Sequence, residues 1–198
     1  MYEGLPEKIK TVGKLCLWRY ELRDDKKTKV PYSVSGKKAD PGNAEDFAPF
    51  GRITEAFAKG GHDGIGLMVE GPFSAIDVDD CTSDGKLTDM AQDIVEMMDS
   101  YTEISPSGKG IRIIFDSEGA DYDSTRYYIN NRNIHTEVYP AGCTIKYVTL
   151  TGNAVRDCGI NPRGEQMLSV AEKYMVRPVK TKASMPPPGE SALSDDEI

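Results

Sequence analysis

The alternation of apolar and polar positions along the chain predicts strands and helices in turn. Apolar runs bounded by turn residues favour strands at residues 15–20, 64–69, 74–78, 101–105, 110–115, 134–140 and 144–151. Apolar residues at helical spacing predict a short helix at 53–59, which Gly60 and Gly61 end, and a longer helix from Leu87 to Met98. A closing helix is expected at 162–176.

This order of elements favours an α+β or α/β fold, with a mixed or antiparallel sheet and helices packed on it. Residues 23–29 are expected to form a charged hairpin tip. Residues 70–72 are expected to make a hairpin-like turn between two apolar strands, and Ala141-Gly142 to separate the last two strands. From residue 179 the chain is rich in Lys, Ser, Pro and acidic residues, which predicts a linker or tail at 179–198.

Composition indicates a globular chain. It has 198 residues, of which 38% are hydrophobic and 28% charged. No apolar run approaches the roughly 18 residues of a membrane span, and the N-terminus lacks the apolar core of a secretion signal. We therefore expect a cytoplasmic protein without membrane partners. The cysteines are far apart and form no Cys-x-x-Cys pair, which argues against structural zinc and disulfides: Cys16, Cys81, Cys143 and Cys158.

The charge is unevenly distributed. A formal net charge of −8 argues against a dedicated nucleic-acid coat, which would be basic. Acidic residues concentrate at 77–103, at 116–123 and in the tail, whereas one short stretch is basic: Lys26, Lys27, Lys29, Lys37 and Lys38. The sequence thus remains compatible with an enzyme that binds nucleic acid through a local patch and metal ions.

The most informative segment is the strand at 74–78 with the acidic residues at its end. Alternation places Asp77 and Asp79 on one face and Val78 on the other. Adjacent carboxylates repel each other unless a cation lies between them, and Mg²⁺ or Mn²⁺ takes such oxygen ligands. For an isolated Asp-x-Asp, a solvated acidic loop is the commoner explanation.

Two further segments have chemistry that fits the same site. The loop with Ser107, Gly108 and Lys109 can point backbone N–H groups at phosphate oxygens, and Arg112 follows it on a strand. A flexible hairpin loop with a surface arginine is the alternative. At 134–139, alternation places His135, Glu137 and Tyr139 on one face, so Glu137 is a candidate third carboxylate. The next strand brings Lys146, and Thr149 or Thr151, near the same surface.

Taken together, these segments resemble the archaeo-eukaryotic primase superfamily, specifically the primase-polymerase (prim-pol) domains of phages, plasmids and related mobile elements. The resemblance covers roughly residues 5–155. Residues 76–80 look like the family's first motif, residues 105–113 like its second, and Glu137 within 136–139 like its third. The resemblance implies one catalytic domain at 1–178 with an RRM-like palm, divided into an N-terminal α/β part to about residue 62 and a metal-binding part at 63–178.

The resemblance also implies an activity and its residues. The reaction would be template-directed nucleotidyl transfer by a DNA primase or DNA polymerase, with two Mg²⁺ or Mn²⁺ ions held by Asp77, Asp79 and Glu137. Contacts to the nucleotide would come from Ser107, Gly108, Lys109, Arg112, Lys146 and Lys38. Many members of the family have histidine where this chain has Arg112, so the nucleotide contact differs here.

The implied partners are nucleoside triphosphates, a single-stranded DNA template, a primer and a downstream helicase module, in a protein encoded by a bacterium, phage or plasmid. Template contacts are expected from Lys29 and Lys37 and from exposed aromatic residues such as Tyr32, Tyr127 or Tyr128.

Other classes of function remain open from the residues alone. One is a non-catalytic module that binds single-stranded DNA or a replication origin, although acidic residues that repel phosphates argue against it. Another is a nuclease or a nucleotide cyclase that uses the same Asp-x-Asp. The last is a domain whose acidic strand end is only solvated.

Overall fold

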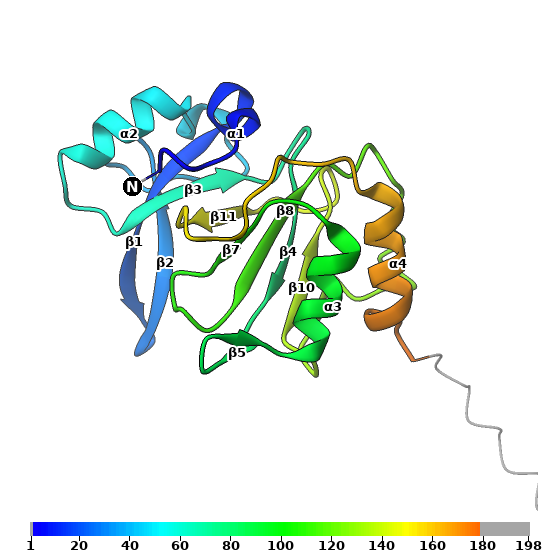
Figure 1. Cartoon of the computed structure of the whole chain (residues 1–198). Coiled ribbons are helices and arrows are strands. Elements are labelled where there is room, and N and C mark those ends of the chain that lie inside the picture. Colours follow the sequence, from blue (N-terminus) through cyan, green and yellow to red (C-terminus); the bar gives the residue numbers. More distant parts are fainter. Residues whose placement is uncertain (1, 179–198) are drawn as a thin grey trace, which may run out of the picture.

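The computed structural model describes residues 2–178, which form two main antiparallel sheets (Figure 1). The four-stranded sheet has the order β11-β3-β1-β2 and consists of β11 (Tyr147–Leu150), β3 (Gly64–Met68), β1 (Leu15–Arg23) and β2 (Lys26–Tyr32). The six-stranded sheet has the order β12-β7-β8-β4-β10-β9 and consists of β12 (Ala154–Arg156), β7 (Thr102–Ile104), β8 (Ile111–Phe115), β4 (Ser74–Val78), β10 (Thr136–Tyr139) and β9 (Asn130–Asn131).

Helices cover the sheets and complete an α+β fold, as the sequence predicted. α1 (Glu7–Val12) and α2 (Phe50–Ala58) lie beside the four-stranded sheet, whereas α3 (Asp89–Met98) and α4 (Gly164–Tyr174) lie beside the six-stranded sheet (Figure 1). A short 3₁₀ helix (Ala44–Asp46) precedes α2, and a small hairpin of β5 (Thr82–Ser83) and β6 (Lys86–Leu87) precedes α3. Within residues 2–178, no helix has the length and apolar character needed to cross a bilayer.

The helical spacing from residue 87 onward correctly predicted α3. Its buried residues repeat every three or four positions, and the side chain of Thr88 caps its N-terminus by accepting a hydrogen bond from the backbone N–H of Ala91. The first helical residue is Asp89, because Lys86 and Leu87 pair with Ser83 and Thr82 in the β5–β6 hairpin. The predicted strands at 15–20 and 110–115 are also present, as β1 and β8.

One predicted strand connection was wrong. β3 and β4 do not form a hairpin through residues 70–72, because β3 belongs to the four-stranded sheet and β4 to the six-stranded sheet. Ala141-Gly142 does separate β10 from β11 as expected, and these two strands also belong to different sheets. All residues of β3 are buried, so its pattern of apolar residues shows that it is internal but does not specify its partner.

The division expected near residue 62 does not coincide with the two sheets. β3 and β11 both lie after that point in the chain, yet they pair with β1 and with each other in the four-stranded sheet. β12 and α1 were not anticipated from the sequence. The predicted tail at 179–198 lies outside the described residues.

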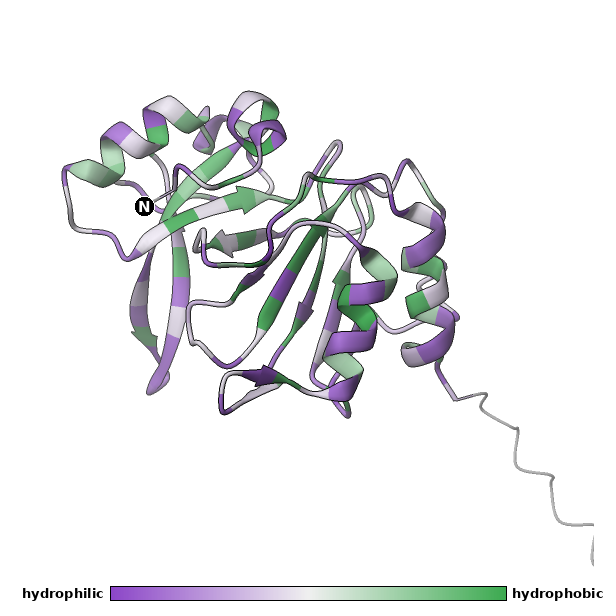
Figure 2. Cartoon of the chain, in the orientation of Figure 1, coloured by the Kyte–Doolittle hydropathy of each residue, from purple (hydrophilic) through white to green (hydrophobic). Residues whose placement is uncertain are grey.

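The two faces of the six-stranded sheet have different surroundings. One face is apolar and packs with α3 and α4 through Ile76, Val78, Ile111, Ile113, Phe115 and Val138. On the other face, Ala75, Ile114, Tyr101 and Tyr139 share a core cluster with residues of β1 and β3. Hydrophilic bands interrupt the mostly hydrophobic strands β4 and β8 in Figure 2. These bands mark the polar part of the second face.

Glycines on β3 make room for aromatic rings on one face of the four-stranded sheet. A Cβ atom at Gly64 would lie 2.8 Å from Trp18 Nε1, and one at Gly66 would lie 2.7 Å from Cδ2 of Tyr147. The rings of Trp18 and Tyr147 therefore lie directly over the backbone of β3. Trp18 is 3% exposed, which agrees with its predicted role as a core anchor.

Candidate active site

Four neighbouring strands place charged side chains in one row across the six-stranded sheet. The register sets Glu103 of β7 opposite Arg112 of β8, Arg112 opposite Asp77 of β4, and Asp77 opposite Glu137 of β10. Residues directly opposite each other in an antiparallel pair have side chains on the same face. The structure therefore brings Glu137 to the same face as Asp77, although 59 positions separate them in the chain.

Arg112 is a buried cation at the centre of this row. Its Nη2 donates a hydrogen bond to Asp77 Oδ2 at 2.6 Å. Its Nη1 donates to Thr149 Oγ1 at 2.6 Å and also to the carbonyl oxygen of Thr149, on the other sheet. The residue is only 4% exposed. Arg112 thus connects the two sheets and neutralises Asp77, whereas the sequence predicted a contact to the nucleotide.

The carboxylates of Asp79 and Glu137 lie within electrostatic range of Asp77. Burial raises the pKa of Asp79, and the negative charge of Asp77 raises it further. Burial also raises the pKa of Glu137, followed by the charge of Asp77 and, more weakly, that of Asp79. Glu137 Oε1 accepts a hydrogen bond from the side-chain amide of Asn130. The ionised forms of Asp79 and Glu137 are therefore disfavoured in the folded protein.

These pKa shifts predict how stability depends on pH. Because the folded protein binds protons on Asp79 and Glu137 more readily than the unfolded chain does, the contribution of these two groups to the free energy of unfolding should fall as pH rises through the raised pKa values. Carboxyls whose pKa values are lowered, such as Asp99 and Asp116, contribute in the opposite direction, so the comparison with a variant isolates this contribution. Urea titrations between the ordinary carboxyl pKa of about 4 and neutral pH would measure this slope. The doubly neutralised variant Asp79→Asn/Glu137→Gln lacks this contribution, so its free energy of unfolding should gain on that of the wild type as pH rises. An equal pH dependence in both proteins would contradict the assignment.

Glu103 is a buried carboxylate that the sequence analysis did not identify. It has no exposed surface, and its oxygens accept hydrogen bonds from the backbone N–H groups of Thr151 (2.9 Å) and Gly152 (3.0 Å) and from the hydroxyl of Tyr101 (3.1 Å). Burial raises its pKa. Glu103 therefore ties the segment after β11 to the six-stranded sheet. The sequence signal that could have identified it is the position of a charged residue, Glu103, within the short predicted strand at 101–105.

A cavity of about 370 Å³ opens between the two sheets at this row. Asp77 and Arg112 line it from the six-stranded sheet, and Lys29, Lys146 and Thr149 line it from the opposite side. Burial lowers the pKa of Lys29, as does the charge of Arg112, while Asp77 and Asp79 oppose this shift. The cavity thus brings one carboxylate, Asp77, together with three cationic side chains, a combination that suits a metal-bound phosphate group.

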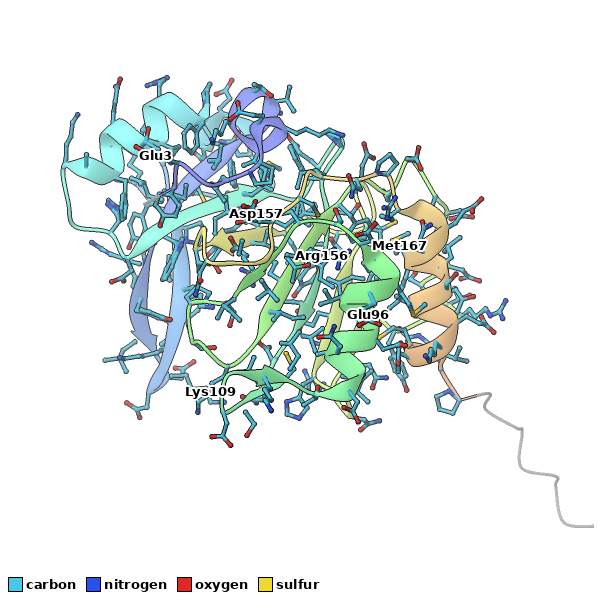
Figure 3. The ribbon with its side chains drawn as sticks, in the orientation of Figure 1. Glu3, Glu96, Lys109, Arg156, Asp157 and Met167 are labelled. Carbon is cyan, nitrogen blue, oxygen red and sulfur yellow. The ribbon has the colours of Figure 1, made fainter. Side chains whose placement is uncertain are left out.

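The predicted phosphate loop lies beside Asp79 and does not line this cavity. The carbonyl of Lys109 accepts hydrogen bonds from the N–H groups of Cys81 (2.8 Å) and Thr82 (3.1 Å), which follow Asp79. The hydroxyls of Ser105 and Ser107 lie 3.0 Å apart. Ser107, Gly108 and Lys109 are exposed, and Figure 3 shows Lys109 at the lower edge of the molecule beside β5.

Gly110 allows this loop to approach the acidic pair. A Cβ atom there would lie 2.6 Å from the carbonyl oxygen of Val78 and 3.1 Å from Cα of Asp79. We expect Gly110→Ala to lower the free energy of unfolding by about 1–3 kcal/mol, because backbone must move to admit the methyl group. Urea denaturation would measure it. Gly51→Ala, on α2 with no atom within 4 Å of the new Cβ, is the matched control and should be stabilising. A free energy of unfolding for Gly110→Ala that is no lower than that of Gly51→Ala would contradict this close approach of the loop.

Three of the predicted binding residues lie elsewhere. Tyr32 is 3% exposed and donates its hydroxyl to Glu21, so the prediction that it is an exposed aromatic residue is wrong. It lies on the face of β2 that contributes to the core with Leu17 and Val30. Lys38 forms an ion pair with the same Glu21 at 2.7 Å, and Lys37 is exposed in the loop after β2. Neither lysine lines the cavity.

Two other expectations need correction. His135 has φ of +51° and precedes β10, so the alternation assumed for His135, Glu137 and Tyr139 begins only at Thr136. Its Nδ1 lies 3.3 Å from Asp80 Oδ2. Tyr127, another aromatic residue considered for template contacts, is 8% exposed. The strand at 136–139 is shorter than predicted because a turn at 132–135 leads into it.

Comparison with known proteins agrees with the motifs. No model of a known protein family matches the chain. A DNA primase-polymerase of Nitratiruptor phage NrS-1 is 30% identical to it over 198 residues, which is 96% of this chain and 26% of that protein. The chain resembles a primase-polymerase domain. It spans about a quarter of the length of this relative, and the similarity agrees with the superfamily that the three motifs indicated.

The donor atoms of the site suit a hard divalent cation. Asp77 Oδ1 is buried and has no hydrogen-bond partner among residues 2–178. Two carboxylates with raised pKa values, Asp79 and Glu137, lie within electrostatic range of Asp77, and carboxylate oxygens are the ligands that Mg²⁺ and Mn²⁺ prefer. In the described part of the chain, however, no three such side chains are already arranged as a metal site. The residues present therefore fit a cation chemically, and its ligand geometry is not preformed.

Proposed function

We propose that this chain is the catalytic domain of a DNA primase-polymerase and catalyses template-directed nucleotidyl transfer. The observation that carries the proposal is the row in which Asp77 and Glu137 lie side by side, with Asp79 in electrostatic range, opposite Lys29 and Lys146. The similarity to a phage DNA primase-polymerase supports the same activity.

In the proposed reaction, the 3′-hydroxyl of a primer or first nucleotide attacks the α-phosphorus of a nucleoside triphosphate, and pyrophosphate leaves. Asp77, Asp79 and Glu137 would hold Mg²⁺ or Mn²⁺. When bound, two such ions would neutralise the charge that develops on the attacking and leaving oxygens. The protein's own contribution is positioning and charge, so no covalent nucleophile is needed.

The remaining residues would position the nucleotide. Lys29 and Lys146 place positive charge in the cavity, where they would attract the triphosphate. The exposed loop at 107–109 lies on the Asp79 side, where the ammonium group of Lys109 would be its contribution to phosphate binding. The backbone N–H groups of Gly108 and Lys109 already donate within the loop, to the carbonyl of Ser105 at 2.9 Å and to Ser107 Oγ at 3.3 Å. Arg112 would hold Asp77 in one orientation, so we assign this arginine a positioning role. Lys38 is a weaker candidate, because it is paired with Glu21 away from the cavity.

The proposed partners follow from the same reaction. They are nucleoside triphosphates, a single-stranded DNA template and a primer. The full length of the phage relative leaves room for further modules, of which a helicase is the partner that we propose. We also propose a cytoplasmic location and an origin in a bacterium, phage or plasmid.

Primer extension tests this function. The chain should extend a labelled primer on a DNA template with Mg²⁺ or Mn²⁺ and release pyrophosphate, and a chelator should abolish both products. Shortening of the primer without extension would indicate a nuclease. A cyclic nucleotide formed without DNA would indicate a cyclase. DNA binding without any cation-dependent product would leave only a binding module.

A further inference from the structure

The inner face of the β1–β2 hairpin carries exposed apolar and basic side chains together. The register pairs Tyr20 with Lys29 and Leu22 with Lys27, so these four residues share one face of the hairpin. Lys29 lines the cavity with Asp77, which shows that this face is turned toward the candidate active site. Tyr20 is 38% exposed and Leu22 is 74% exposed. The site and motifs described above use neither residue.

A second cavity, of about 330 Å³, lies next to Tyr20. The rings of Tyr20 and Trp18 line one side, and Pro106 of the loop between β7 and β8 and Thr151 also line it. Tyr20 lines this cavity, while its cross-strand neighbour Lys29 lines the cavity at Asp77. The two cavities therefore adjoin at this pair of residues.

The local contacts hold Tyr20 in place. Its ring meets that of Trp18 edge-on, with 5.2 Å between the centroids. Its backbone N–H donates to Asp63 Oδ2 at 2.7 Å. Asp63 is the acidic residue among those lining this cavity, and this bond engages one of its oxygens. Lys27 Nζ lies 5.7 Å from the centroid of the Tyr20 ring, so a mobile cation accompanies the aromatic surface.

We propose that this cavity is a subsite for an unpaired base of single-stranded DNA, which stacks on Tyr20 while Lys27 contacts the adjoining phosphate. An aromatic ring beside flexible cations is the combination that binds single strands without regard to sequence. The position next to the proposed phosphate cavity favours a nucleic acid over a protein partner. The identification of the bound DNA as the template rests on the proposed function. The binding of single-stranded DNA at this cavity does not depend on that function.

Stacking on Tyr20 can be tested by fluorescence anisotropy with a short labelled oligothymidine and the 198-residue chain, without nucleotide or divalent cation. Tyr20→Ala should weaken binding roughly 5- to 150-fold, which corresponds to about 1–3 kcal/mol for one stacked base. Tyr20→Phe keeps the ring and should bind as the wild type does. On an abasic oligonucleotide of the same length, Tyr20→Ala should have no effect, because no base is available to stack.

The charged contact has a matched control on the same hairpin. Lys26 and Lys27 are both exposed, but the register places Lys26 opposite Arg23 and Lys27 opposite Leu22, so they lie on opposite faces. Lys27→Ala should weaken binding of the oligonucleotide. It should also lower the slope of log binding constant against log salt concentration by about one phosphate contact, whereas Lys26→Ala should change neither. Both variants alter one exposed lysine and should fold normally.

The outcomes separate this inference from the proposed function. Normal binding by Tyr20→Ala, or equal effects of Lys26→Ala and Lys27→Ala, would overturn the subsite even if the wild type extends primers. If the wild type does not extend primers but Tyr20→Ala still binds the oligonucleotide more weakly than the wild type, the subsite is supported and the proposed reaction is rejected. Tight binding of a peptide but not of the oligonucleotide would overturn the inference in favour of a protein interface.

Discussion

Asp79→Asn is expected to lower the rate of primer extension by roughly 10²- to 10³-fold, because it removes one ligand charge worth several kcal/mol in the transition state. The protein should nevertheless fold at least as stably as the wild type. Burial and the charge of Asp77 already raise the pKa of Asp79, so its negative charge is unfavourable in the folded protein. Primer extension and urea denaturation of the same preparation would measure both effects.

Asp80→Asn is the matched control for this variant. Asp80 is the next residue, is exposed like Asp79 and undergoes the same chemical change, but its Oδ2 lies near His135 Nδ1 at 3.3 Å. Its activity should stay close to that of the wild type. Glu137→Gln should behave like Asp79→Asn, because the amide oxygen of glutamine can still accept the hydrogen bond from Asn130. Full activity of Asp79→Asn, or equal losses in the Asp79 and Asp80 variants, would reject the site.

Arg112→Met should lower the free energy of unfolding by about 3–5 kcal/mol, because it leaves Asp77 as a buried charge without its partner. Urea denaturation would measure the loss. The side chains of Arg112 and Asp77 are 5% and 15% exposed, so water compensates little for the lost pair. The variant also loses the hydrogen bonds to Thr149 that connect the two sheets. The same change at exposed Arg132 should stay within about 0.5 kcal/mol of the wild type.

A second substitution distinguishes a lost ion pair from lost packing. In Arg112→Met/Asp77→Asn the orphaned charge is removed as well, so the double variant should recover part of the stability lost by Arg112→Met alone. Arg112→Lys keeps the charge but lacks the planar group that reaches Asp77 and Thr149 together, and should lie between wild type and Arg112→Met. If Arg112→Met were as stable as the control, Arg112 would be free to bind the nucleotide as the sequence first suggested.

These expectations give Arg112 a different role from the nucleotide contact that the resemblance implied. In the structure its guanidinium makes the contacts that a cation at Asp77 would otherwise satisfy. Arg112 therefore keeps Asp77 neutralised before substrate arrives. The acidic groups that remain unpaired by arginine, Asp79 and Glu137, are those whose pKa values are raised. This difference explains why a change at Asp79 should affect activity, and a change at Arg112 stability.

The sequence by itself determined the features that depend on neighbours along the chain. Alternation placed Val78 inside, and it is fully buried. Helical spacing located α3, and Gly-containing segments marked the turns. The three motif segments indicated a primase-polymerase domain without any knowledge of their spatial arrangement. The strand, helix and turns could be predicted because the side-chain periodicity and backbone conformation that favour them involve residues only a few positions apart.

Only the tertiary structure decided which strands are partners. Strands apolar on both faces, such as β3, satisfy several pairings equally well from sequence, and the choice depends on contacts between distant segments. The register across β7, β8, β4 and β10 places residues that are distant in the sequence side by side, in the row from Glu103 to Glu137. The same long-range packing buried Tyr32, left Tyr20 exposed, and paired Arg112 with Asp77. Charge and burial at a site are properties of that assembly, which no local pattern encodes.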